Sequence, residues 1–207
     1  MQQGEPMRRV QAAVLLSGTG RTLENLLAHR AAGTLDIDIP VVISSRDGVR
    51  GLDVAHAAGI EAHVVARRVF GSPEAMSARV QEIITPLRID LLLLSGFLSQ
   101  LSILPEWEGR MLNVHPSLLP LFGGQGFYGR RVHEAVLAAG MKVSGCTVHE
   151  VNAEYDAGPI LAQRCVPILP DDTPDSLGAR VFAAECEVYP EAIRDFIART
   201  RGLASHS

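Results

Sequence analysis

Residues 10–27 read VQAAVLLSGTGRTLENLL, and this stretch decides the fold class. The apolar run at 10–17 is continuous, which is typical of a strand buried on both faces of a parallel sheet. A glycine-rich turn follows at 18–20, and leucines then recur at helical spacing over 22–33. A buried strand, a glycine turn and an amphipathic helix form the first unit of an α/β sheet.

The same alternation continues along the chain. The pattern predicts further strands at 37–45, 60–66, 89–97, 110–115, 145–151 and 160–169, of which 89–97 is the most apolar and therefore central. It predicts further helices at 49–59, 72–87, 130–140 and 174–201. The last two strands have no long helix between them, which indicates an antiparallel edge. We therefore predict a single-domain, Rossmann-like α/β fold with a mainly parallel sheet flanked by helices.

Composition narrows the class of protein. The chain has 207 residues, of which 47% are hydrophobic, and a net charge of −4, so we expect a globular domain at 9–201 with polar tails at 1–8 and 202–207. The negative charge gives no support for a nucleic-acid partner, and no apolar run is long enough for a membrane helix. Three cysteines without a CxxC motif, and no export signal, predict reduced thiols, no structural zinc and a cytoplasmic location.

Ligands of such sheets bind beyond the carboxyl ends of the strands. The loop at 18–22 suits phosphate, because glycines and a helix N-terminus present backbone N–H groups to an anion. It is not a dinucleotide fingerprint, since Leu23 stands at the last glycine position, and it lacks the lysine of a P-loop. The segment 95–101 follows the most apolar strand and suits a flat heterocycle. The alternatives are a structural turn and a plain strand end.

Two further segments carry side-chain chemistry. Asn113 and His115 alternate along one strand, so their side chains share a face, and an amide with an imidazole suits a developing oxyanion. Asp156 lies in the turn-rich segment 149–159, where a carboxylate would orient a histidine and raise its pKa. Neither H-E-x-x-H nor G-x-S-x-G occurs, so we predict neither a metal nor a serine nucleophile.

Five motifs together resemble the folate-dependent formyltransferases, and within them the glycinamide ribonucleotide transformylases: VLLSGTGRTLENLL, DLLLLSGFLSQLS, MLNVHPSLLP, GCTVHEVNAEYDAGPI and AAECEVYPEAI. The resemblance covers residues 10–196. It implies transfer of a formyl group from the co-substrate 10-formyltetrahydrofolate to the primary amine of 5'-phosphoribosylglycinamide, in de novo purine (IMP) biosynthesis. It implies small-molecule substrates only, no metal, and a monomer or homodimer.

The resemblance also assigns roles to individual residues. The catalytic residues would be Asn113, His115 and Asp156. The ribonucleotide-binding residues would be Gly20, Arg21, Thr22 and Glu185. The folate-binding residues would be Leu98, Ser99, Gln100, Leu101, Asn113, His149, Asn152 and Asp156.

This sequence departs from the family pattern in places. Arg21 and Thr22 stand where the family has Ser and Asn, and Arg21 would either contact phosphate or face solvent. Ser99 replaces a family Arg, and Arg67 or Arg68 would substitute for another. The glycine-rich stretch 122–129 is longer than in many members, and it would be either a mobile lid or a surface turn.

Three rival functions belong beside this one. A methionyl-tRNA formyltransferase would need a C-terminal domain that grips tRNA, and a formyltetrahydrofolate hydrolase would carry an N-terminal regulatory domain. We expect neither domain here. A non-catalytic folate- or nucleotide-binding module is disfavoured by the intact set of Asn113, His115 and Asp156.

Overall fold

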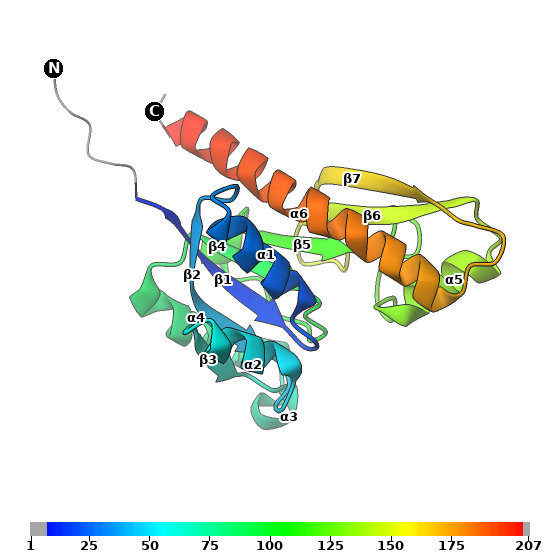
Figure 1. Ribbon diagram of the computed structural model, residues 1–207. Helices are drawn as coiled ribbons and strands as arrows, with labels where there is room; N and C mark the ends of the chain where they lie inside the picture. The colour runs from blue at the N-terminus through cyan, green and yellow to red at the C-terminus, as the bar shows by residue number, and fades with distance from the viewer. Residues whose placement is uncertain (1–7, 205–207) are drawn as a thin grey trace, which may run out of the picture.

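The computed structural model describes residues 8–204, with side chains to residue 200, and seven strands in that part of the chain form one mixed sheet (Figure 1). In chain order they are β1 (Val10–Leu16), β2 (Ile37–Ser44), β3 (Glu61–Val64), β4 (Leu91–Ser95), β5 (Met111–His115), β6 (Val143–Glu150) and β7 (Ile160–Pro167). Across the sheet their order is β3-β2-β1-β4-β5-β6-β7. The strands β1 to β5 pair in parallel, whereas β6 pairs antiparallel with both β5 and β7. The predicted antiparallel edge and the central position of the most apolar strand are confirmed.

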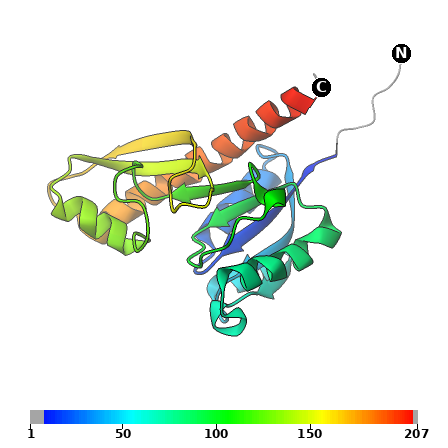
Figure 2. The same ribbon diagram turned by 180° about the vertical axis from the view of Figure 1, so that it is seen from behind.

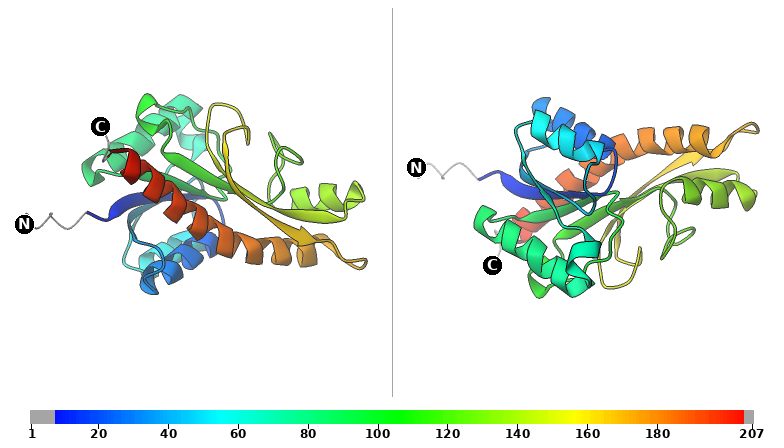
Figure 3. Two further views of the ribbon diagram at one scale, coloured as in Figure 1. Left: turned by 90° about the horizontal axis from the view of Figure 1, so that it is seen from above. Right: turned by 90° about the horizontal axis from the view of Figure 1, so that it is seen from below.

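Helices cover both faces of the sheet (Figures 2 and 3). They are α1 (Arg21–Ala31), α2 (Arg50–Ala57), α3 (Arg67–Phe70), α4 (Pro73–Ile84), α5 (Arg130–Ala138) and α6 (Pro174–Ala204), with single 3₁₀ turns η1 (Thr85–Leu87) and η2 (Pro105–Trp107). One face is packed by α1, α2, α5 and α6, and the other by α4 and η2. The long helix α6 extends from beside α5 toward α1 (Figure 1).

Side chains of the central strands alternate between these two layers. In β1, Ala12, Val14 and Leu16 face the layer of α1 and α6, whereas Ala13 and Leu15 face the layer of α4. All five are completely buried. A strand that is covered on both sides has no polar face, which explains the continuous apolar run in its sequence.

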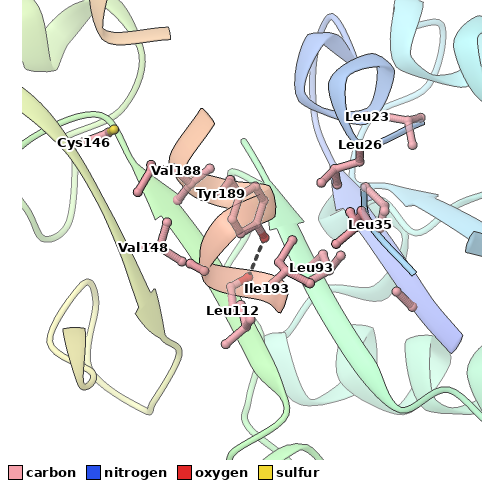
Figure 4. Packing of buried hydrophobic residues seen from close by; sticks show 14 of the residues in the cluster. Leu23, Leu26, Leu35, Leu93, Leu112, Cys146, Val148, Val188, Tyr189 and Ile193 are labelled. Carbon is pink, nitrogen blue, oxygen red and sulfur yellow. Dashed lines mark hydrogen bonds between the residues drawn. The ribbon is translucent and has the colours of Figure 1, made fainter. Parts of the chain in front are cut away.

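Tyr189 anchors α6 to the middle of the sheet (Figure 4). Its ring is fully buried, and its hydroxyl donates to the carbonyl oxygens of Leu94 and Leu112, each at 3.1 Å. These two carbonyls belong to β4 and β5. A buried tyrosine hydroxyl needs such partners, and here they fix α6 over the last parallel pair of the sheet.

The capping signals that begin the predicted helix at 72–87 are confirmed at the start of α4. Ser72 caps α4 by accepting from the Ala75 N–H at 3.2 Å, with Pro73 at the first helical position. Most element ends differ from the prediction by one to three residues; for example, α1 begins at Arg21 rather than at residue 22, and α6 continues to Ala204.

The predicted tails are described only in part, and residues 202–204 of the second tail continue α6. Residues 1–7 and 205–207 lie outside the described part of the chain. Arg8, which we assigned to the first tail, forms an ion pair with Asp90 at 2.7 Å. Within residues 8–204, no helix combines the length and the apolar character that a membrane span requires.

Candidate active site

A cavity of about 910 Å³ opens at the carboxyl ends of β1, β4 and β5, the edge where open α/β sheets bind ligands. A smaller cavity of about 100 Å³ adjoins it and shares Asn113 and Asp156 among its lining residues. All residues assigned a catalytic, ribonucleotide-binding or folate-binding role from the sequence line one of the two cavities, whereas Arg68 lines neither. Leu101, His149 and Asn152 line the smaller cavity, and the other assigned residues line the larger one.

The phosphate-binding candidate is built from backbone. Gly20 precedes α1 with a φ of 76°, and no side chain caps the first turn of that helix. The backbone N–H groups of the first turn of α1 therefore have no partner within the helix, and they point at the edge of the larger cavity. A Cβ atom on Gly20 would lie 2.6 Å from the Cα atom of Gly51 on α2, so the close approach of the two helices requires glycine here.

Asn113 and His149 are neighbours across the antiparallel pair of β5 and β6. The Asn113 side-chain amide donates to Nε2 of His149 at 3.1 Å, and Nδ1 of His149 donates to the Glu150 carbonyl oxygen at 2.9 Å. These bonds fix the tautomer and the orientation of the buried His149 ring. The bond to His149 uses one of the two N–H groups of the Asn113 amide and leaves the other available to a ligand.

Asp156 completes the cluster from the loop between β6 and β7. Its Oδ2 lies 3.4 Å from Nδ1 of His115 and accepts from the Gly124 N–H at 2.9 Å, and its Oδ1 lies 3.6 Å from Nε2 of His149. The residue has a φ of 53°, a conformation that is uncommon outside glycine. The turn is tight, because a Cβ on Gly158 would lie only 1.8 Å from the Glu150 carbonyl oxygen.

His115 has both ring nitrogens engaged. Its Nε2 atom donates to the carbonyl oxygen of Phe122 at 2.9 Å, while Nδ1 faces Asp156. We expected the carboxylate to raise the pKa of this histidine, and Asp156 does act in that direction, but burial of the ring outweighs it. Burial of the ring lowers the pKa of His115 below its usual 6.5, and the opposing effects of Asp156 and the Phe122 carbonyl are smaller. The imidazole is therefore mainly neutral at neutral pH.

Asp156 is ionised over the same range. Burial alone would raise its pKa, but the contact with His149, the charge of His115 and the Gly124 N–H together hold the pKa below its usual range. The cluster thus pairs a neutral imidazole with a carboxylate. That combination can accept a proton at His115 and stabilise the resulting imidazolium.

The structure adds residues that the sequence did not single out. Ser17 accepts a hydrogen bond from the Leu98 N–H at 2.8 Å, and its hydroxyl lies 2.5 Å from that of Ser45. It therefore joins the phosphate-loop candidate to the folate candidate segment. His133 on α5 also lines the larger cavity. Ser17 could have been found from its position directly before the glycine loop. No local sequence pattern marks His133.

Several open questions from the sequence have a geometric answer. Arg21 does not simply face solvent, because its guanidinium lies 3.7 Å from the centre of the Phe182 ring. Arg67 lines the larger cavity and is the better placed of the two candidate arginines. Within the described residues, no group of three or more His, Cys, Asp or Glu side chains is arranged to hold a metal ion.

Comparisons with known proteins agree on one family. The sequence profile of the formyl transferase family matches residues 10–193. The chain is 42% identical over 190 residues to the trifunctional purine biosynthetic protein adenosine-3 of Drosophila melanogaster, covering 90% of this chain but 14% of that protein. It is 34% identical to the chloroplastic phosphoribosylglycinamide formyltransferase of Arabidopsis thaliana, covering 90% of this chain and 65% of the relative.

Solved structures extend the likeness to whole chains. Glycinamide ribonucleotide transformylase 1 from Symbiobacterium toebii superposes with a TM-score of 0.84 at 36% identity, covering 93% of this chain and 92% of that one. The phosphoribosylglycinamide formyltransferase of Brucella melitensis gives a TM-score of 0.82 at 40% identity, covering 91% and 96%. The seven-stranded sheet and its flanking helices are therefore shared with proteins of this kind.

Proposed function

Because the chain belongs to the formyl transferase family, we propose that it transfers the formyl group of 10-formyltetrahydrofolate to the primary amine of 5'-phosphoribosylglycinamide, in de novo purine biosynthesis. The observation that carries the proposal is the buried cluster of Asn113, His115, His149 and Asp156, which opens into the same cavity as the glycine loop. One cavity thus offers a site for an anionic ribonucleotide and a site for acyl-transfer chemistry.

The two substrates would meet above β5. The phosphate of the ribonucleotide would lie against residues 18–22, with Glu185 on α6 near its sugar. The folate would occupy the smaller cavity and its mouth, between residues 98–101 and 152–156. Holding both reactants side by side replaces a bimolecular encounter by a local one, which supplies much of the rate acceleration.

Asn113 would stabilise the tetrahedral intermediate. The substrate amine attacks the formyl carbon, and the carbonyl oxygen becomes an oxyanion. The second N–H of the Asn113 amide is available to donate to that oxygen, because the first is held by His149 at 3.1 Å. The bond to His149 therefore aims the amide.

His115 would carry the proton. As the new C–N bond forms, the amine loses one proton to the neutral imidazole, and Asp156 at 3.4 Å stabilises the resulting imidazolium. The same proton then passes to the leaving folate nitrogen, as the bond from that nitrogen to the formyl carbon breaks. Nε2 carries its hydrogen toward the Phe122 carbonyl at 2.9 Å, so it accepts a proton only after that carbonyl moves away and the ring hydrogen sits on Nδ1, facing Asp156. This requirement makes the 122–129 stretch a candidate lid.

The setting of the protein follows from the same proposal. We expect a cytoplasmic enzyme that acts on small molecules, without nucleic-acid or membrane partners, as a monomer or homodimer. The net charge of −4 disfavours a polyanionic partner, and it leaves the recognition of a small anionic substrate to local groups such as those of the glycine loop.

Product analysis tests the proposal. Purified protein is incubated with 10-formyltetrahydrofolate and 5'-phosphoribosylglycinamide, and mass spectrometry follows the formylated ribonucleotide and tetrahydrofolate, which should form in equal amounts. Formate release without the ribonucleotide would indicate a hydrolase, and turnover only with an aminoacyl-tRNA would indicate a tRNA-directed enzyme. Absence of all three reactions would leave a binding module and overturn the proposal.

A further inference from the structure

Arg50 and Arg21 both lie beside the glycine loop, but only the Arg50 side chain forms hydrogen bonds and an ion pair with other described residues. Arg50 on α2 donates to the Thr19 carbonyl oxygen at 2.9 Å and makes a two-pronged ion pair with Glu24, at 3.0 Å and 2.5 Å. Its charge and most of its N–H groups are therefore used in holding α2 against the start of α1. It is not free to recognise a ligand.

Arg21 is placed differently. It is the first residue of α1, and its guanidinium carbon lies 3.7 Å from the ring centre of Phe182 on α6. Both side chains line the larger cavity. Among residues 8–204, no hydrogen bond or ion pair engages its guanidinium N–H groups. A guanidinium that is held over the face of an aromatic ring leaves its N–H edge open for bidentate bonding.

Glu185 lies beside this pair without cancelling its charge. It is one helical turn beyond Phe182 and lines the same cavity, yet it forms no ion pair with any described residue. Burial raises the pKa of its carboxyl to about 8, while the positive charge of Arg21 acts in the opposite direction. A carboxyl that keeps its proton at neutral pH leaves the Arg21 charge available for an anion.

We propose that Phe182 is a positioning residue for phosphate recognition, which holds the Arg21 guanidinium over its ring so that the N–H edge meets the phosphate that the loop at 18–20 receives. The backbone N–H groups of α1 and the stacked arginine then grip the phosphate from two sides. The inference deepens the proposed function, because it takes the ribonucleotide phosphate as the ligand. It assigns to Phe182, an aromatic residue on α6 that lines the same cavity, a role that it performs through Arg21.

Binding measurements separate this role from turnover. Calorimetric titration of 5'-phosphoribosylglycinamide, with ribose 5-phosphate as a second probe, is done on wild type, Arg21→Ser, Phe182→Leu and the double variant. Arg21→Ser should weaken binding about 5- to 30-fold, which overlaps the lower part of the range for a hydrogen bond to a charged group. Phe182→Leu should reproduce part of that loss, and the double variant should bind no worse than Arg21→Ser alone.

Three further readouts distinguish positioning from packing. Phe182→Tyr should restore binding, because it keeps the ring. The loss in Arg21→Ser should shrink as salt rises, because an exposed pair is screened. Arg199→Ser is the matched control, since Arg199 lies 5.9 Å from the Phe196 ring at the far end of α6, away from the cavity, and it should bind like wild type.

Two results would overturn the inference. Equal affinities for wild type and Arg21→Ser at low salt would show that the backbone alone holds the phosphate. An equal effect of Phe182→Leu with and without Arg21 would show that Phe182 acts through packing. Thermal melts of each variant check folding. Because these titrations need no catalysis, they stand even where formyl transfer is absent, so failure of the proposed function is recognised separately.

Discussion

The two walls of the larger cavity differ in the chemical groups that they present to a ligand. The wall that follows the parallel strands β1 and β4, which we call the backbone wall, has glycine at positions 18, 20 and 96 and offers the uncapped N–H groups of α1. The wall at the antiparallel pair of β5 and β6 consists of buried side chains in contact with one another. The departures from the family pattern at Arg21, Thr22 and Ser99 all fall on the first wall. A backbone wall tolerates exchange of side chains, whereas a side-chain wall depends on each member.

The largest effects should therefore come from the side-chain wall. We expect His115→Ala and Asp156→Asn each to lower kcat by at least ~100-fold, the scale of acid–base and oxyanion groups, with little change in the binding of either substrate. Steady-state kinetics and titrations check this. His56→Ala is the control, because that histidine is exposed on α2, and it should retain wild-type kcat. Near wild-type turnover in His115→Ala would sink the catalytic assignment.

Binding at the backbone wall should weaken strongly only where a substitution adds a side chain that the backbone geometry cannot accommodate. Gly20→Val places a branched side chain at a φ of 76° and 2.6 Å from the Gly51 Cα atom. We expect KM for the ribonucleotide to rise ~10-fold or more, KM for the folate to change far less, and stability to fall by about 1–3 kcal/mol. Gly59→Val is the matched control, since Gly59 has a similar φ of 70°, its Cβ would meet no atom within 4 Å, and it lines neither cavity; it should lower stability without raising either KM. An equal rise of both KM values would contradict the placement of the phosphate.

A smaller effect is expected from the hydrogen bond between Ser17 and Leu98, which connects two segments of the backbone wall. Ser17→Ala removes the acceptor of the Leu98 N–H, a bond of 2.8 Å that connects residues 81 positions apart. The loss should cost about 1 kcal/mol, which corresponds to a roughly fivefold rise in KM for the folate. Ser45→Ala leaves that bond in place and should change the folate KM less. Identical behaviour of the two variants would mean that the serine pair acts only in packing.

The smallest effect is a shift in titration. NMR titration of the His115 ring should give a pKa below 6.5, and the acidic limb of kcat/KM should lie below pH 6.5 as well. Removing the negative charge in Asp156→Asn disfavours the imidazolium, so the pKa of His115 should fall further. A rise in that variant, or a wild-type pKa above 6.5, would show that the carboxylate outweighs burial.

Local patterns carried most of the fold. The alternation of apolar strands with amphipathic helices, the Ser72 cap and the helix-free link between the last two strands all depend on neighbouring residues, and each led to the observed element. The short helix α3 and the turns η1 and η2 escaped, because three or four residues carry no periodicity. The motifs also pointed to many of the residues that line the two cavities, but not to His133 or Phe182, and the binding roles stay predictions.

By itself, the sequence determined the α/β class, the edge of the sheet where ligands bind, and the residue types gathered there. Only the tertiary structure decided how those residues act on one another. The low pKa of His115 arises from burial by segments distant in the chain, and the contacts of Arg21 with Phe182 and of Ser17 with Leu98 join elements that no local pattern relates. Periodicity and capping are set by nearest neighbours along the chain, whereas desolvation and stacking depend on what the completed fold brings alongside.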